Sequence, residues 1–282
     1  VYDTATGRLI STIEAPGDRD PLGLGSAWLD RSGTRLFRLS IGAEMTYPGP
    51  WPVQLVAHAT SMGAEIARLD LPNVQAGYWP TELTAAWLGC TANAEGTPFA
   101  SPVYEDNVWM TESPGIALAP DGNSMAVVDA DGSRLTIVDL TAMRIVRTTN
   151  ITADDPVLPR QATPDDSAGP CRGTLGSWRF ANFSVGGTHI YVNGYTTYSD
   201  ETKTQSVQWF GLLRLDVASA KVGSRLTTPP GVMASLLADA FQSPDGQYLY
   251  VTLSDRGNRS LILQRLDAAT FAVLAERRFD SV

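Results

Sequence analysis

The sequence predicts an all-β fold assembled from repeated four-stranded antiparallel units. Its apolar runs are short, alternate with polar residues and are rich in Val, Ile, Leu and Tyr, as in half-buried strands. Turn signals such as Pro-Asp-Gly stand directly before these runs and supply the positive φ that tight hairpins need. No long segment has a 3.6-residue apolar period, so helices are not expected.

The clearest copy of the unit covers 115–149, "GIALAPDGNSMAVVDADGSRLTIVDLTAMRIVRTT". The first turn is the Pro-Asp-Gly at 120–122, and the second is the Asp-Gly at 131–132. Asp139 ends the third strand, and "MRIVRTT" forms the fourth. We expect the middle strands to pack one face on each neighbouring unit.

Three more copies and one partial copy extend the pattern. The full copies span about 24–70, 177–226 and 236–280, while residues 1–14 match only the second half of the unit. Four short antiparallel strands repeated at this spacing predict the blades of a β-propeller, with about four and a half blades visible.

The segments "SPDGQYLYVT", "LDAATFAVLAERRF" and "VYDTATGRLISTI" resemble the YVTN-type β-propeller repeat. That family is close to the WD40-like quinoprotein amine dehydrogenase propellers. The resemblance covers most of the chain outside two long segments, but such blades occur in enzymes, binding proteins and scaffolds alike. Two copies depart from it, with Arg31-Ser32-Gly33 and Gly186-Gly187 in place of the Asp-Gly turn.

The blade count does not close a ring. The chain opens with a half-blade, yet the last copy already has four strands, so sheet edges would stay exposed. We therefore expect a segment of a six- or seven-bladed propeller, or a ring completed by another polypeptide. The chain begins without Met, which fits a processed or incomplete protein. The alternative is a missed blade in 73–114 and a ring of about five.

Residues 73–114 are too long for an ordinary connection and are rich in aromatic residues. Together with a Trp in "TYPGPWP" of the first full blade, they supply the candidate binding residues, which are Trp51, Tyr78, Trp79, Trp87, Tyr104 and Trp109. Three interpretations remain open: packing onto the blades, a protein interface, and stacking on sugar rings.

The Pro/Asp-rich loop at 151–176 offers carboxylate oxygens suited to calcium. The residues concerned are Asp154, Asp155, Asp165 and Asp166. Their spacing is not that of an EF-hand, and a solvated acidic loop is the alternative interpretation.

Cys90 and Cys171 both lie in Gly/Thr/Pro-rich stretches. In an oxidising compartment they would be able to form one disulfide. Two unpaired thiols are the alternative, because spacing alone does not establish connectivity.

Charge and hydropathy exclude several classes of partner. The net charge is −9 and the pI about 4.7, which disfavours nucleic acid and binding to anionic lipid through a basic patch. No apolar run reaches the length of a membrane span, and no signal peptide is recognised at the start.

Catalytic motifs are also missing. The two histidines, His58 and His189, lie in strand-like runs and are expected to be structural. No HExxH, CxxC, CxxCH or GxSxG motif occurs. The leading hypothesis is a non-catalytic, extracytoplasmic interaction or scaffold propeller without a cofactor, acting as a subunit of a larger protein assembly. The alternatives are a propeller enzyme, lactonase-like or dehydrogenase-related, and a carbohydrate-binding propeller.

Overall fold

The computed structural model confirms the all-β prediction. It describes residues 1–2, 5–13, 27–41, 51–80, 109–130, 132–151, 172–200, 205–209, 211–226, 234–235, 240–255 and 260–280. Every regular element in these ranges is a strand. Accordingly, no described segment forms a helix with the length and apolarity needed to cross a membrane.

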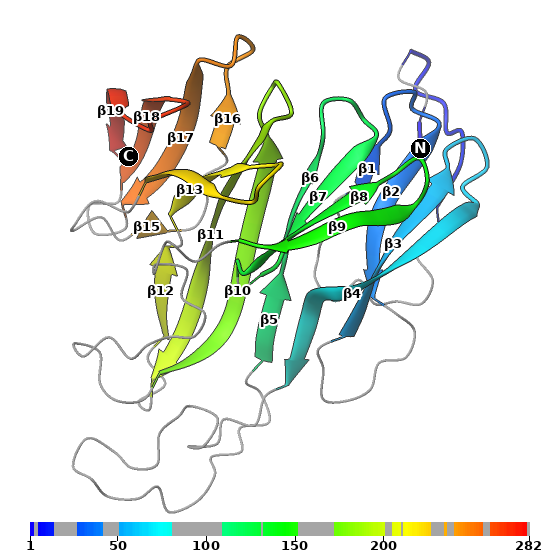
Figure 1. The fold of residues 1–282 in the computed structure, drawn as a ribbon, viewed down its shortest axis with the longest axis horizontal. Coiled ribbons are helices and arrows are strands. Elements are labelled where there is room, and N and C mark those ends of the chain that lie inside the picture. Colours follow the sequence, from blue (N-terminus) through cyan, green and yellow to red (C-terminus); the bar gives the residue numbers. More distant parts are fainter. Residues whose placement is uncertain are drawn as a thin grey trace, which may run out of the picture.

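Four antiparallel meanders follow one another along the chain and form four blades (Figure 1). Blade 1 contains β1 (Ala27–Leu29), β2 (Arg35–Ile41), β3 (Trp51–Ala59) and β4 (Glu65–Pro80). Blade 2 contains β6 (Gly115–Leu118), β7 (Ser124–Val128), β8 (Arg134–Asp139) and β9 (Arg144–Asn150). Blade 3 contains β10 (Arg172–Phe183), β11 (His189–Asp200), β13 (Leu212–Asp216) and β14 (Val222–Leu226). Blade 4 contains β16 (Ala240–Gln242), β17 (Tyr248–Asp255), β18 (Ser260–Asp267) and β19 (Val273–Asp280), and β15 (Ala234–Ser235) pairs with the far end of β17. This succession of four-stranded blades is the architecture of a β-propeller.

A short hairpin precedes blade 1, as the half-copy in the sequence predicts. Tyr2 and Leu9 form an antiparallel bridge. Ser11 Oγ donates a hydrogen bond of 2.6 Å to the carbonyl of Thr60, in the β3–β4 turn. The described residues of 1–13, called the N-terminal hairpin below, therefore attach to blade 1.

The turn between the first two strands has the same geometry in all four blades. Its last residue is a glycine with φ of 69°, 70°, 71° and 74° at Gly33, Gly122, Gly187 and Gly246. Each of these glycines donates its amide N–H to the carbonyl three residues earlier. Only this last position requires positive φ. The two departures from Asp-Gly in the sequence therefore preserve the turn.

The blades are held together by three apolar clusters, one at each interface. Phe37 and Leu55 of blade 1 pack with Met125 and Val127 of blade 2. The alternate residues of β7, Ala126 and Val128, pack instead on blade 3. A third cluster joins Tyr191 and Leu212 of blade 3 to β17 and β18 of blade 4. Each blade thus has a backward face on the preceding blade and a forward face on the following one.

Several strands continue beyond the blades and pair with one another, so that blades 1 and 3 belong to one sheet, called the extended sheet below. β4 pairs with β5 (Trp109–Ser113), and β5 pairs in parallel with β10. β11 pairs with β12 (Gln205–Trp209) at its far end. In Figure 1 these strand ends lie together below the blades. The segment expected as an insert at 73–114 thus starts and finishes as strands, and blades 1 and 3 share a ten-stranded sheet.

Candidate interaction surfaces

A recurring contact fixes each blade to the next one. Where blade 3 meets blade 4, Tyr191 Oη donates to the carbonyl of Ala268 at 3.3 Å, and Arg214 Nη1 donates to the carbonyl of Ala269 at 3.3 Å. Both carbonyls belong to the turn between β18 and β19. The forward face of blade 3 therefore clasps the turn that follows the third strand of blade 4.

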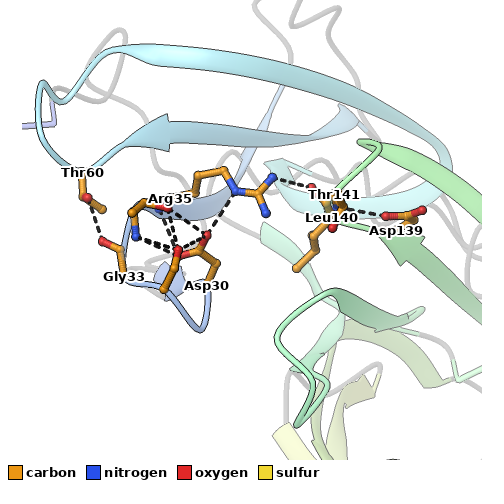
Figure 2. Close-up of polar contacts among 9 residues, drawn as sticks. Asp30, Gly33, Arg35, Thr60, Asp139, Leu140 and Thr141 are labelled. Carbon is orange, nitrogen blue, oxygen red and sulfur yellow. Dashed lines mark hydrogen bonds and ion pairs between the residues drawn. The ribbon is translucent and has the colours of Figure 1, made fainter.

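The other two interfaces use an arginine in the same way. Arg35 Nη1 of blade 1 donates to the carbonyl of Leu140 at 2.9 Å, as Figure 2 shows. Arg147 Nη1 of blade 2 donates to the carbonyl of Ala218 in blade 3. Leu140 and Ala218 both lie in the turn after the third strand of their blade, so this turn is the common acceptor.

Asp30 orients the arginine of the first interface. Its carboxylate accepts hydrogen bonds from Arg35 Nε at 3.2 Å and from the amide of Thr34 at 2.9 Å (Figure 2). Burial alone would raise the pKa of the Asp30 carboxyl, but hydrogen bonds from the Arg35 amide, Ser32, the Arg35 side chain and the Thr34 amide together lower it. The hydrogen bonds therefore favour the ionised Asp30 carboxylate, which is the form that accepts the hydrogen bond from Arg35.

The forward face of blade 4 has no blade packed on it among the described residues. Register places Phe37, Ala126, Tyr191 and Tyr250 at one equivalent position, each opposite the third strand of its blade. The first three are 0%, 0% and 3% exposed, whereas Tyr250 is 40% exposed. Arg265 faces Tyr250 across the strands, as Arg214 faces Tyr191.

We call this surface the blade 4 end face. It consists of Phe241, Tyr250, Leu261, Leu263, Arg265, Arg277 and Phe279. Phe241, Leu261 and Phe279 are exposed large apolar side chains, and the Arg277 guanidinium lies 5.1 Å from the ring centroid of Phe279. Sequence reasoning missed this site, although aligning Tyr250 and Arg265 with Tyr191 and Arg214 would have indicated it.

The N-terminal hairpin exposes, on its backward face, a position that the full blades bury. Tyr2 stands at the end of the third strand of the half-blade, where the full blades carry His58, Val138, Leu215 and Leu266. The four residues in full blades are buried, whereas Tyr2 is 66% exposed. Both ends of the row of blades therefore expose positions that every internal interface buries.

The predicted aromatic residues are partly placed by strand register. Trp51 pairs with Ala76, Tyr78 with Thr111, and Pro80 with Trp109, so these positions lie in neighbouring strands of the extended sheet together with Trp79. Trp87 and Tyr104 lie outside the described residues.

A described aromatic pair, which sequence reasoning did not select, lies in the same sheet. The rings of Trp178 and Tyr195 stack with centroids 4.8 Å apart and an interplanar angle of 19°. Phe180 lies 6.5 Å from Tyr195. Trp178 and Phe180 lie on β10, and Tyr195 lies on the neighbouring strand β11. β10 also pairs with β5, the strand that begins at Trp109, so the stacked rings lie beside β5.

Each histidine accepts a hydrogen bond from an arginine. Arg38 Nε lies 3.1 Å from His58 Nε2, and Arg214 Nη2 lies 2.9 Å from His189 Nε2. Since guanidinium only donates, both imidazoles are neutral. Burial lowers the pKa of both rings, and the charges of Arg38 and Arg214 lower it further.

The remaining predicted residues lie outside the described part of the chain. They are Cys90, Cys171, Asp154, Asp155, Asp165 and Asp166. Within the described ranges, no three His, Cys, Asp or Glu side chains gather as a metal site.

Comparisons with known proteins give remote structural likeness only. No protein-family model matches the chain, and no curated protein sequence matches it. The Dos1 propeller is 9% identical over 91% of this chain and 47% of its own, with a TM-score of 0.43. The Cps50 (Swd1) β-propeller domain of Myceliophteria thermophila is 10% identical over 90% of this chain and 57% of its own, with a TM-score of 0.41. Hydrazine synthase of Kuenenia stuttgartiensis is 12% identical over 94% of this chain and 68% of its own, with a TM-score of 0.38.

The chain thus spans about half the length of the Dos1 and Swd1 structures, at 47% and 57%. The neighbours include propeller domains and an enzyme, so they do not separate scaffold from catalyst. Because every TM-score quoted is below 0.5, the propeller assignment rests on the blade topology described above.

Proposed function

We propose that this chain is a protein-interaction propeller, an extracytoplasmic scaffold that acts as a subunit of a larger assembly. The observation that carries the proposal is the blade 4 end face, which presents exposed positions that the three preceding blades bury. Aromatic side chains and arginine, which this face presents at Phe241, Tyr250, Phe279, Arg265 and Arg277, are residue types enriched at protein interfaces. An exposed apolar sheet face of this kind is also a liability unless a partner covers it.

Site-specific photo-crosslinking in the source organism tests the proposal. A photoreactive phenylalanine analogue placed at Tyr250 is expected to form a covalent protein adduct, identified by mass spectrometry. The matched control carries the same analogue at Val146, which is exposed on the outer strand of blade 2 and away from both end faces. Absence of any protein adduct at position 250, with the protein correctly folded, would contradict the interaction function.

The extracytoplasmic location is part of the same proposal. A Cys90–Cys171 disulfide would support it, because such bridges persist mainly in oxidising compartments. Alkylation and mass spectrometry of protein from its source check this point. Two freely alkylated thiols would argue against both the bridge and the location.

We further propose that the unit is a YVTN-type repeat that needs no cofactor. The turn glycine and the Asp that ends the third strand support the repeat type. In three blades Asp139, Asp216 and Asp267 accept backbone amide hydrogen bonds in the following turn. A crystal structure that fails to superpose blade by blade on a YVTN propeller would contradict the family. Bound calcium in elemental analysis would contradict the absence of a cofactor and support the site at Asp154, Asp155, Asp165 and Asp166.

A second function, carbohydrate binding, is favoured by one observation, the Trp178–Tyr195 stack in the extended sheet. Aromatic faces pack on sugar rings, and this sheet also carries Tyr78, Trp79 and Trp109. Titration with a broad glycan panel is expected to change the tryptophan fluorescence, and Trp178→Ala is expected to remove the change. An unchanged spectrum across the panel would rule out this function.

A further inference from the structure

We propose that His189 is a pH-sensitive switch at the interface of blades 3 and 4, which loosens blade 4 when the imidazole takes up a proton. The ring lies against the arginine that holds the β18–β19 turn of blade 4. This inference concerns regulation of the fold and does not depend on the interaction function proposed above.

The guanidinium of Arg214 connects His189 to blade 4. Its Nη1 atom donates a hydrogen bond of 3.3 Å to the carbonyl of Ala269. Its Nη2 atom lies 2.9 Å from Nε2 and 3.4 Å from Nδ1 of His189. Arg214 Nε is buried and has no hydrogen-bond partner in the part of the chain that the structure describes. The His189 ring therefore helps to set where the guanidinium lies.

The equivalent contact between blades 1 and 2 is oriented by a carboxylate instead of an imidazole. Asp30 accepts a hydrogen bond of 3.2 Å from Arg35 Nε, and Arg35 Nη1 donates to the carbonyl of Leu140 (Figure 2). A carboxylate stays ionised through the neutral and mildly acidic range, whereas an imidazole changes its charge there. Of these two interfaces, the one that contains His189 is therefore the one expected to respond to mild acid.

A proton on His189 would place a positive charge directly against the guanidinium of Arg214. Two like charges at the distances given above repel each other. An imidazolium ring also has no lone pair left to accept a hydrogen bond. Both effects displace Arg214 from the carbonyl of Ala269, which weakens the hold of blade 3 on the turn of blade 4.

The other ionisable groups of this cluster keep their charge in mild acid. Asp216 lies opposite His189 in strand register, and Asp267, at the end of β18, interacts with the charge of Arg214. The pKa of each carboxyl is lowered, mainly by hydrogen bonds from the turn that follows it, so both remain ionised above about pH 4. Burial raises the pKa of Tyr191, which stays neutral. His189 is thus the member of the cluster that titrates in this range.

The direction of the pH effect follows from the surroundings of the ring. Burial, and then the charge of Arg214, lowers the pKa of His189, while the charge of Asp216 acts in the opposite direction. When blade 4 separates from blade 3, the ring regains its ordinary pKa of about 6.5. The separated form therefore binds the proton more tightly. The interface is most stable above about pH 6.5 and opens more often as the pH falls below that value.

Native-state hydrogen exchange of the full chain, measured by mass spectrometry at pH 7.5 and 5.5, tests the proposal. After correction for the intrinsic exchange rate, the protection of β17 and β18 is expected to fall about 3- to 10-fold at the lower pH. That is the range for uptake of one proton about one pH unit below the ordinary pKa of histidine. β7 and β8 of blade 2 are the internal comparison, and their protection is expected to change little.

Two variants assign the effect to one ring. His189→Gln carries a neutral side chain at every pH and is expected to remove the loss of protection in blade 4. The matched control is His58→Gln, because His58 contacts Arg38 within blade 1. Figure 1 shows blades 1 and 4 at opposite sides of the molecule, so this control is expected to leave the response of blade 4 unchanged.

Three results would overturn the proposal. The first is an equal loss of protection in blades 2 and 4, and the second is no loss in blade 4. Neither of these depends on a variant, so they decide the matter even if His189→Gln folds poorly. The third is a loss in blade 4 that persists in His189→Gln, because another group would then be responsible. None of these results changes the outcome of photo-crosslinking at Tyr250, so the two proposals fail separately.

Discussion

Blades 3 and 4 both present a tyrosine and an arginine on their forward faces. In the described part of the chain, another blade packs only on the pair of blade 3. Tyr191 and Arg214 are packed on the next blade, and their polar atoms bind two carbonyls of its turn. Tyr250 and Arg265 stand at the equivalent positions with the tyrosine 40% exposed. Blades 3 and 4 therefore carry the same pair of interface side chains, and burial of that pair depends on whether another blade packs against it.

The largest difference between the two faces is expected when each tyrosine is replaced by alanine in a separate variant. Tyr191→Ala is expected to cost about 3–5 kcal/mol of unfolding free energy, because it leaves a cavity between two blades. Tyr250→Ala is expected to cost below about 1 kcal/mol in the dilute chain, where that side chain is exposed. Urea unfolding of both variants measures the difference. Equal losses would show that the blade 4 end face is covered within the chain.

The attachment of the N-terminal hairpin is tested by two glycines at equivalent turn positions. Gly63 has φ of 70°, and a Cβ there would clash with the carbonyl oxygen of Thr12, whereas Gly7 has φ of 67° and open space around it. Gly63→Ala is therefore expected to cost about 3 kcal/mol, the left-handed strain plus a clash.

Gly7→Ala is the matched control and is expected to cost only the strain, about 1–2 kcal/mol. Thermal or urea unfolding measures both variants. If the two substitutions are equally costly, the hairpin does not pack against the β3–β4 turn.

The contact between Arg35 of blade 1 and Leu140 of blade 2 is expected to stabilise the fold in a pH-dependent way, because the Asp30 carboxylate binds Arg35. Asp30→Asn is expected to cost about 1–2 kcal/mol at pH 7, because the charged hydrogen bonds to Arg35 and the turn amides weaken. The folded pKa of Asp30 is lowered, so its contribution is complete above the unfolded value of about 3.9 and is lost as the pH falls through the folded pKa.

The difference between the wild type and Asp30→Asn should therefore shrink as the pH falls from 4 downward. Asp245→Asn, in the exposed turn of blade 4, serves as the control and should have a smaller effect at pH 7. A difference that stays constant down to pH 2 would show that the Asp30 charge is not what supports the contact.

The smallest effect concerns the buried backward face of blade 1, where His58 stands at the position that Tyr2 exposes in the hairpin. Burial, together with the charge of Arg38, lowers the pKa of His58 below its unfolded value. The unfolded chain then binds the proton first, so stability is complete above about pH 6.5 and declines as the pH falls below it. His58→Gln is expected to flatten this decline between pH 7 and 5 in equilibrium unfolding. An unchanged slope would contradict the buried neutral ring.

Much of the fold was predictable because it depends on local chemistry. The Gly residues at 33, 122, 187 and 246 and the strand-ending Asp residues mark the turns, and alternation marks the two faces of each middle strand. The end face was predictable in principle from the alignment of Tyr250 with Tyr191. The extended sheet was not, because the parallel pairing of β5 with β10 joins residues far apart in the chain.

The sequence by itself determined that the chain is a row of four-stranded blades preceded by half a blade, since turns and alternation are set by neighbouring residues. Only the tertiary structure decided which copies of the repeated face are buried. Tyr191 and Tyr250 are the same residue in the same local pattern, and burial is a property of what packs against a side chain. The tertiary structure also decided the arginine contacts at Leu140, Ala218 and Ala269. Each of them joins two blades whose residues are far apart in the chain.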